Sequence, residues 1–202
     1  MPRHVDHDQR RAELTAALLR IASTRGLQAV TMREVAAEAG VSLRVVQYYV
    51  TDKATLLTAG LAELAARLDR RVKARAAAAG GSLSIRQVLE VVLGAVLPID
   101  EESRADALAW TAFYAVALTD PGLGAGGPNH PDALEAWLVA RLERAQAEGE
   151  APADLDARSE VVLLLALANG LTSSVLGRQR TAEDALRVLR HQLDRVLGPK
   201  AG

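Results

Sequence analysis

Cysteine is absent from this 202-residue chain, and aromatic residues make up only 3% of it. The absence of cysteine excludes disulfides and thiolate metal sites, which fits a reducing cytoplasm. Long apolar runs are missing as well, since the longest extends only from Val161 to Ala168, whereas a bilayer span needs roughly 20 residues. The polar N-terminus, MPRHVDHDQRR, also lacks the apolar core of a secretory signal. We therefore expect a soluble, cytoplasmic protein.

Neither sign of charge is in large excess. Residues 1–60 contain eight Lys or Arg against six Asp or Glu, and residues 61–202 contain sixteen against nineteen, for a net charge of −1. This bias is much weaker than in strongly basic nucleic-acid-binding proteins. Binding to DNA would therefore depend on a local basic face that is doubled in a dimer.

Helix-forming residues dominate the composition, and apolar residues repeat at helical spacing between Gly, Pro and Ser. We predict an all-α protein of about nine helices, the first of which spans 8–25 with Leu14, Leu18 and Ile21 on one face. The second is predicted to start at Thr31, and the others to cover 43–49, 53–78, 84–96, 102–119, 131–148, 155–177 and 181–197.

The segment from Thr31 to Lys53, TMREVAAEAGVSLRVVQYYVTDK, carries the most information in the chain. Thr31 and Glu34 match a capping box at the start of one short helix. Gly40 suits the tight corner that follows, and Ser42 suits the cap of a second helix. Small apolar residues are available for the packed faces: Val35, Ala36, Ala39, Val41, Val45 and Val46. This pattern is typical of a helix-turn-helix.

The second helix of this corner leaves four side chains facing outward, namely Leu43, Arg44, Gln47 and Tyr48. Arg pairs well with guanine, Gln with adenine, and Leu can contact a thymine methyl group. Phosphate oxygens suit the hydroxyl and ammonium groups of Thr31, Ser42, Tyr49 and Lys53. The alternative is an ordinary helical corner with solvent-exposed Arg and Tyr.

Residues 10–57 resemble the N-terminal domain of the TetR-type transcriptional repressors. The resemblance rests on the opening amphipathic helix, on Gly26 followed by Thr31, and on two segments: Val35-Ala36-x-x-Ala39-Gly40-Val41-Ser42 and Lys53-x-x-Leu56-Leu57. It implies base or groove contacts from Leu43, Arg44, Gln47 and Tyr48. It implies phosphate contacts from Thr31, Ser42, Tyr49 and Lys53.

Two positions depart from the usual pattern of that family, which commonly has Tyr in place of Gln47 and Phe in place of Val50. Gln47 changes the operator sequence that we expect, because a Gln side chain recognises adenine readily and Tyr does not. Val50 is a smaller core residue and concerns packing.

The pair Gly80-Gly81 follows an Ala-rich stretch and marks a break in composition, and we divide the chain there. Residues 1–53 are predicted to form a helix-turn-helix DNA-binding domain, and 53–78 a connecting helix. Residues 79–202 are predicted to form a helical ligand-binding and dimerisation domain, whose length and layout are similar to those of the TetR-type proteins.

The last two predicted helices carry an apolar seam, and two such helices from each subunit would form a four-helix bundle. The predicted seam consists of Leu164, Leu167, Leu171, Leu186, Leu189, Leu193 and Val196. A repressor that reads palindromic half-sites also needs two-fold symmetry. The alternative is that both helices pack only within their own chain.

Four of the six aromatic residues fall on two neighbouring predicted helices, 102–119 and 131–148. The resemblance to the TetR-type proteins favours a ligand cavity here, and we predict that it is lined by Trp110, Phe113, Tyr114, Trp137, Arg141 and Asn169. The alternative, aromatic residues that only fill the core, stays open for each of them.

No catalytic motif, metal site or cofactor fingerprint is recognisable. His4 and His7 resemble a loose metal-binding tail, but a flexible N-terminus accounts for them more simply. We predict a non-enzymatic repressor, released from a palindromic operator by a small hydrophobic or amphipathic ligand. The alternatives are a helical protein-binding adaptor and a small helical enzyme that uses the aromatic pocket.

Overall fold

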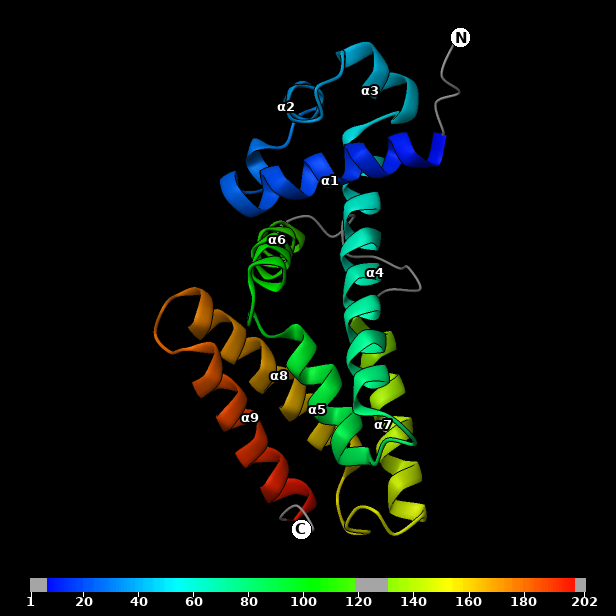
Figure 1. The fold of residues 1–202 in the computed structure, drawn as a ribbon, viewed down its shortest axis with the longest axis vertical. Coiled ribbons are helices and arrows are strands. Elements are labelled where there is room, and N and C mark those ends of the chain that lie inside the picture. Colours follow the sequence, from blue (N-terminus) through cyan, green and yellow to red (C-terminus); the bar gives the residue numbers. More distant parts are fainter. Residues whose placement is uncertain (1–6, 119–130, 199–202) are drawn as a thin grey trace. The chain divides into compact units, whose positions relative to one another are not determined.

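The computed structural model describes residues 7–118 and 131–198. Within these residues the chain forms nine α-helices, one short 3-10 helix and no strand, which confirms the all-α prediction (Figure 1). The elements are α1 (His7–Arg25), η1 (Leu27–Ala29), α2 (Met32–Glu38), α3 (Leu43–Tyr49), α4 (Lys53–Ala79), α5 (Ile85–Val96), α6 (Glu101–Ala117), α7 (Pro131–Ala147), α8 (Ala157–Leu176) and α9 (Ala182–Leu197).

The chain divides into two compact units, and two helices are shared between them. One unit holds Met1–Ala66 and Ala105–Ala125, and the other holds Arg67–Arg104 and Gly126–Gly202. Accordingly, α4 begins in the first unit and ends in the second, whereas α6 begins in the second and ends in the first. The sequence suggests a break at Gly80-Gly81, whereas the boundary between the two compact units falls inside α4 and inside α6. Both helices cross this boundary without interruption.

α1 places its apolar face in the core of the first unit, together with residues of α2, α3, α4 and α6. Leu14, Leu18 and Ile21 are fully buried there, in agreement with their helical spacing. An exposed ion pair joins Arg20 of α1 to Glu38 of α2 at 2.7 Å. Since exposed pairs contribute only about 0–1 kcal/mol, the buried side chains supply most of the stability of this unit.

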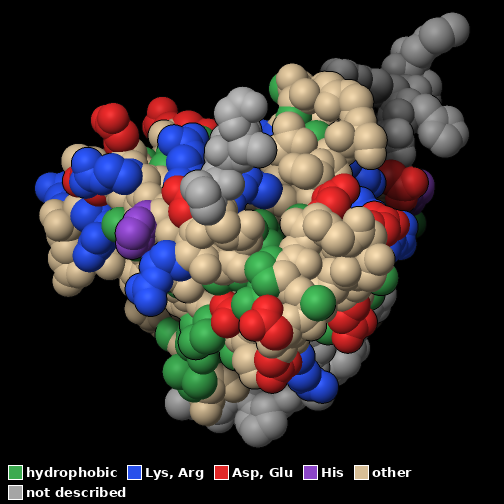
Figure 2. Space-filling model, turned by 90° about the horizontal axis from the view of Figure 1, so that it is seen from below, with side chains coloured by type: hydrophobic (Ala, Val, Ile, Leu, Met, Phe, Trp, Pro, Cys, Tyr) green, Lys and Arg blue, Asp and Glu red, His purple; other side chains and the backbone are tan. Residues whose placement is uncertain are grey.

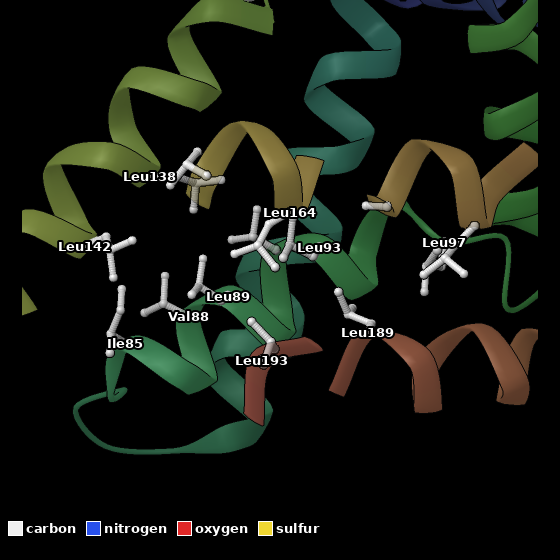
Figure 3. Packing of buried hydrophobic residues seen from close by; sticks show 14 of the residues in the cluster. Ile85, Val88, Leu89, Leu93, Leu97, Leu138, Leu142, Leu164, Leu189 and Leu193 are labelled. Carbon is white, nitrogen blue, oxygen red and sulfur yellow. The ribbon is translucent and has the colours of Figure 1, made fainter. Parts of the chain in front are cut away.

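The second unit has a leucine-rich core to which α5, α7, α8 and α9 all contribute. Figure 3 shows Leu89 and Leu93 of α5 close to Leu164 of α8, with Leu142 of α7 and Leu193 of α9 in the same cluster. Each of these five side chains is at most 1% exposed. A fully buried Leu contributes about 1.5–3 kcal/mol, so this cluster holds the unit together.

The seam predicted for a dimer lies largely inside this core. Five of its residues are at most 5% exposed: Leu164, Leu171, Leu189, Leu193 and Val196. The other two, Leu167 and Leu186, are partly buried against the same cluster. This burial favours the alternative that both helices pack within their own chain, because helical spacing identifies a buried face without indicating whether the same chain or a partner covers it.

α8 carries apolar and small residues on the opposite face as well. Val162 is 43% exposed and Leu163 is 58% exposed, and Ala166 and Gly170 follow as exposed residues. The helix is 20 residues long with a mean hydropathy of 1.6, so that its length and composition alone would allow it to cross a membrane. Because its inner face completes a protein core, we interpret its outer face as an apolar surface left uncovered within the described residues.

Candidate nucleic-acid interface

The corner between α2 and α3 depends on a residue in the left-handed region of backbone space. Gly40 has φ of +66°. The Val41 N–H donates to the Ala36 carbonyl at 2.9 Å, and the Gly40 N–H donates to the Ala37 carbonyl at 3.2 Å. This Schellman arrangement ends α2 and turns the chain sharply. A side chain at position 40 would meet open space, so the need for Gly comes from the backbone and not from crowding.

Side chains cap both helices of the corner. Thr31 Oγ1 accepts a hydrogen bond from the Glu34 N–H at 3.1 Å, and Ser42 Oγ accepts one from the Val45 N–H at 3.4 Å. The second half of the predicted capping box is replaced by an ion pair, because the Glu34 carboxylate lies 2.7 Å from Arg25 of α1. That pair ties α2 to α1 and so braces the corner.

α3 has one buried face and one exposed face. Val46 is fully buried in the core that also contains Val35 of α2. Arg44, Gln47 and Tyr48 are exposed, and Tyr48 exposes 72% of its surface. A short helix held from behind, with long polar side chains in front, suits entry into a major groove.

The other predicted DNA-binding residues surround this helix. Thr31, Ser42 and Lys53 are exposed, whereas Leu43 and Tyr49 are partly buried. A hydroxyl or an ammonium group on an exposed side chain can reach a phosphate oxygen. The eight predicted residues thus belong to one unit, and none of them is fully buried.

Lys53 is the first residue of α4, and an acid precedes it. Asp52 Oδ1 accepts a hydrogen bond from the Thr55 N–H at 2.7 Å. This bond and one from the Thr55 hydroxyl hold the pKa of Asp52 below its ordinary value. Asp52 therefore stays ionised at neutral pH and caps the helix that begins with Lys53.

Two residues of α1, absent from the predicted set, reach the same surface. Arg10 lines a shallow hollow of about 350 Å³ together with Arg44, Tyr48 and Tyr49. The ring of His7 lies 6.2 Å from that of Tyr48 and 5.4 Å from that of Tyr49, between ring centroids. The structure therefore corrects the interpretation of His7 as a flexible terminal residue, since it belongs to the first turn of α1. Only its position at the edge of the amphipathic segment 8–25 could have indicated this.

Of the described cations near α3, one is partly neutralised. Arg10 pairs with Glu13 at 2.5 Å, while Arg44 and Lys53 are exposed. Elsewhere the surface is mixed, and the face in Figure 2 intersperses basic, acidic and hydrophobic side chains. Binding to DNA by this near-neutral chain thus depends on the small group of cations at the corner.

The residues predicted to line a ligand cavity fall in both units. Those of the first unit all lie on α6 and are Trp110, Phe113 and Tyr114. Phe113 is 1% exposed and belongs to the core of the unit, while Trp110 is partly buried against the same cluster. Tyr114 is 66% exposed. Phe113 is thus a core residue, which is the alternative named for it, because successive helical positions point in different directions.

The second unit contributes Trp137 and Arg141 from α7 and Asn169 from α8. The Arg141 guanidinium lies 5.3 Å from the centre of the Trp137 ring, in cation–π geometry. The Arg141 Nε atom is buried with no hydrogen-bond partner among the described residues. A buried donor of this kind costs about 1–3 kcal/mol, so it favours an acceptor from water or a ligand.

Two family models match the chain, one ending early in α4 and the other beginning at the start of α5. Residues 14–59 match bacterial regulatory proteins of the tetR family, and residues 85–198 match the C-terminal region of the BetI-type transcriptional repressors. The second match alone covers more than half of the chain. The chain belongs to the TetR family of transcriptional repressors. This TetR-family protein is a DNA-binding regulator, and the match favours that role over the adaptor and the enzyme.

Relatives of this TetR-family regulator agree with the family match. It is 27% identical over 202 residues to the HTH-type transcriptional regulator BetI of Burkholderia mallei, covering 99% of this chain and 100% of the relative. It is 31% identical over 117 residues to the regulator PksA of Bacillus subtilis, a match that spans 58% of this chain and 56% of that protein. A crystal structure from Rhodococcus sp., described as a TetR-family regulator, gives a TM-score of 0.85 at 27% identity, covering 94% of this chain and 99% of that one.

Proposed function

We propose that this regulator works as a dimer in the cytoplasm, binds a palindromic operator and represses transcription until a small ligand releases it. The observation that carries the proposal is the braced helix α3, which buries Val46 and exposes Arg44, Gln47 and Tyr48. An isolated protomer has one such helix, so a palindrome requires a second copy.

Base recognition is assigned to the exposed side chains of α3. Arg44 and Gln47 can each form two hydrogen bonds to a base edge, with guanine and adenine respectively, and Tyr48 extends beside them. Leu43, which is partly buried, contributes an apolar contact to a thymine methyl group. Phosphate contacts are assigned to Thr31, Ser42, Tyr49 and Lys53, all of which lie at or near the ends of helices.

Selection of bound sequences from a random pool of DNA duplexes tests this assignment. We expect a two-fold symmetric consensus, with half-sites about one helical turn apart or a multiple of it. Affinity for that consensus should fall steeply as salt rises, since phosphate contacts release counterions. Recovery of no enriched sequence, or of an asymmetric single site, would count against the proposed mode of binding.

The second copy is expected to pack on the outer face of α8. Val162 and Leu163 expose apolar surface there, and a Cβ atom added at Gly170 would meet nothing within 4 Å. Gly in the middle of a helix costs roughly 0.5–1 kcal/mol relative to Ala, and the described part of this chain offers no packing reason for it. Close approach of a partner helix would supply such a reason.

Ala166 and Ala140 provide a matched pair of substitutions for the dimer. Both are exposed helical alanines, on α8 and α7 respectively. Ala166→Arg should place a long charged side chain in the interface and shift the protein towards monomers in sedimentation equilibrium. Ala140→Arg makes the same chemical change away from α8 and should leave the dimer intact. If both variants remained equally dimeric, another surface would have to form the interface.

The ligand is expected to be small and amphipathic, with an acceptor group for the Arg141 Nε atom. Trp137 beside Arg141 supplies aromatic surface, and Asn169 of α8 is an exposed polar residue in the same unit. We also assign Trp110 and Tyr114 of α6 to the response to the ligand, because α6 belongs to both units. Ligand binding would then shift the dimer towards a population whose α3 helices do not match successive major grooves.

The chain has only two tryptophans, so each can report separately. In Trp110→Phe the emission comes from Trp137, and in Trp137→Phe it comes from Trp110. We expect one or more amphipathic compounds to change the Trp137 emission and to weaken operator binding. Operator DNA should weaken the binding of that compound by the same factor, because linkage is reciprocal. A compound that binds without this reciprocity would not be an inducer.

A further inference from the structure

We propose that His7 of α1 is a further operator-binding residue, which contacts a phosphate in its protonated form and thereby makes operator affinity depend on pH. The inference rests on the proposed mode of DNA binding by α3. It extends the interface to α1, a helix that supplies none of the contacts assigned above.

Geometry places His7 beside the recognition helix. Its ring lies 5.4 Å from Tyr49 and 6.2 Å from Tyr48, and the two tyrosines meet each other edge to face at 5.0 Å. Tyr48 is 72% exposed and His7 is exposed as well. The three rings therefore form one cluster, held by two helices, on the side of the unit from which α3 would meet DNA.

The surroundings of His7 favour an anion. Among the described residues, its titratable and charged neighbours are Asp8, Arg10, Arg11 and Glu13 on α1 and Arg44, Tyr48 and Tyr49 on α3. Arg10 and Arg44 line the hollow beside the tyrosines, together with the hydroxyl-bearing Ser42. Two described acids belong to this group: Asp8 lies 3.9 Å from Arg11, and Glu13 pairs with Arg10 at 2.5 Å. A DNA phosphate in this hollow would meet two guanidinium groups and a hydroxyl, with an imidazole at its edge.

Histidine is the side chain whose charge ordinarily changes between about pH 5 and 8. A phosphate in contact with the ring favours the imidazolium, so binding of the operator should be accompanied by proton uptake at His7 in each protomer. Operator affinity should therefore rise as the pH falls through this range. The tyrosine rings lie against one side of the imidazole and help to hold it in place.

Four variants separate charge from packing. His7→Gln removes the charge, His7→Phe keeps an aromatic ring without charge, and His7→Lys fixes a positive charge at every pH in the range. His191→Gln is the matched control, because His191 is an exposed histidine on α9 in the other unit. Circular dichroism and sedimentation would show that each variant remains folded and dimeric before DNA is added.

Binding to the selected operator is measured by fluorescence anisotropy at pH 6.0 and 8.5, over a series of salt concentrations. At pH 6.0 we expect His7→Gln and His7→Phe to bind roughly tenfold more weakly than the wild type, as for two exposed charge contacts per dimer. Their slope of log affinity against log salt should be smaller by about two, one for each protomer. At pH 8.5 these two variants should match the wild type, while His7→Lys should bind tightly at both pH values and His191→Gln should follow the wild type.

The proposal is overturned if His7→Gln and the wild type share the same pH profile and salt slope. It is also overturned if His7→Phe behaves like the wild type, since the ring would then act by packing alone. If the protein bound no selected DNA at any pH, the proposed operator binding through α3 would be refuted instead. The failure of the His7 proposal and the failure of the proposed function can therefore be told apart.

Discussion

Gly60 is a position where one added methyl group would test the core of the first unit. It lies inside α4, and a Cβ atom there would be 2.7 Å from Leu18 Cδ2 of α1 and 3.0 Å from Phe113 Cζ of α6. Leu18 is 0% exposed and Phe113 is 1% exposed, so neither side chain can retreat into solvent. Gly60→Ala should therefore push both side chains out of their rotamers or separate the helices that carry them.

Two opposing effects set the magnitude of this change. Replacing Gly by Ala inside a helix stabilises it by about 1 kcal/mol. Inserting a methyl group into a filled core costs about 1–3 kcal/mol. We expect the packing cost to exceed the helical gain and to leave the variant destabilised by about 1 kcal/mol. For a protein of this size that corresponds to a decrease in Tm of about 2–4 °C.

Urea unfolding followed by circular dichroism measures the effect, and a double-mutant cycle identifies its cause. Leu18→Val removes the atom that the new methyl group would meet first. In the Leu18→Val background, Gly60→Ala should lower the free energy of unfolding by less than it does in the wild type. The double-mutant cycle should therefore give a favourable interaction energy between the two substitutions. Stabilisation of the single variant by the full helical gain would refute the reasoning, because it would show that Leu18 and Phe113 leave room for the methyl group.

Four other substitutions have defined outcomes. Gly40→Ala should destabilise the protein by about 1 kcal/mol and weaken operator binding, because its φ of +66° disfavours a side chain; urea unfolding and anisotropy measure both effects. Lys53→Ala should weaken binding to all DNA sequences about equally, whereas Arg44→Ala should relax preference at particular positions by about 1–3 kcal/mol, as competition between single-base operator variants would show. The pKa of Asp100 lies below its ordinary value, because its carboxylate accepts hydrogen bonds from the Ser103 N–H and hydroxyl and interacts with two arginines of α4. The ionised Asp100 therefore stabilises the fold at pH values above its unfolded-state pKa, and this stabilisation is lost as the pH falls through its folded-state pKa. Thermal unfolding of Asp100→Asn should therefore depend less on pH in the acidic range than that of the wild type.

The helix ends at the corner were predictable because the atoms that fix them are near in sequence. Ser42 caps α3 through an N–H three residues away, and Gly40 ends α2 because its own N–H bonds the carbonyl three residues before it and the next N–H bonds the carbonyl five residues before that donor. α3 accordingly has the predicted bounds, Leu43–Tyr49. The exposed positions of Arg44 and Gln47 also follow from helical periodicity once the helix is placed.

Features that depend on distant partners were not predictable in this way. Glu34 pairs with Arg25 of α1 and not with the N–H of Thr31, since a guanidinium is a stronger partner once the fold brings it near. A complete capping box forms instead at the start of α5, between Ser84 and Gln87. The local pattern is the same at both sites, and the tertiary surroundings decide between them.

Long-range packing also explains the differences on α6, α8 and α9. The spacing of Leu189 and Leu193 shows that one face of α9 is buried, but it holds no information on what covers that face. Phe113 lies on a helix that the sequence assigns to the C-terminal domain, yet it fills the core around α1 and α4. His7 could be read only as terminal, because its tyrosine neighbours lie more than forty residues further along the chain.

The enclosure of both leucine-rich clusters within one chain bears on how the regulator responds to its own abundance. A protomer whose core is complete can exist alone, so pairing would be a reversible step and not a condition for folding. Occupancy of the operator would then vary with the square of the protomer level when that level is low. A modest fall in the protomer level would empty the operator more sharply than in proportion, so the controlled genes would respond to the amount of regulator as well as to the ligand.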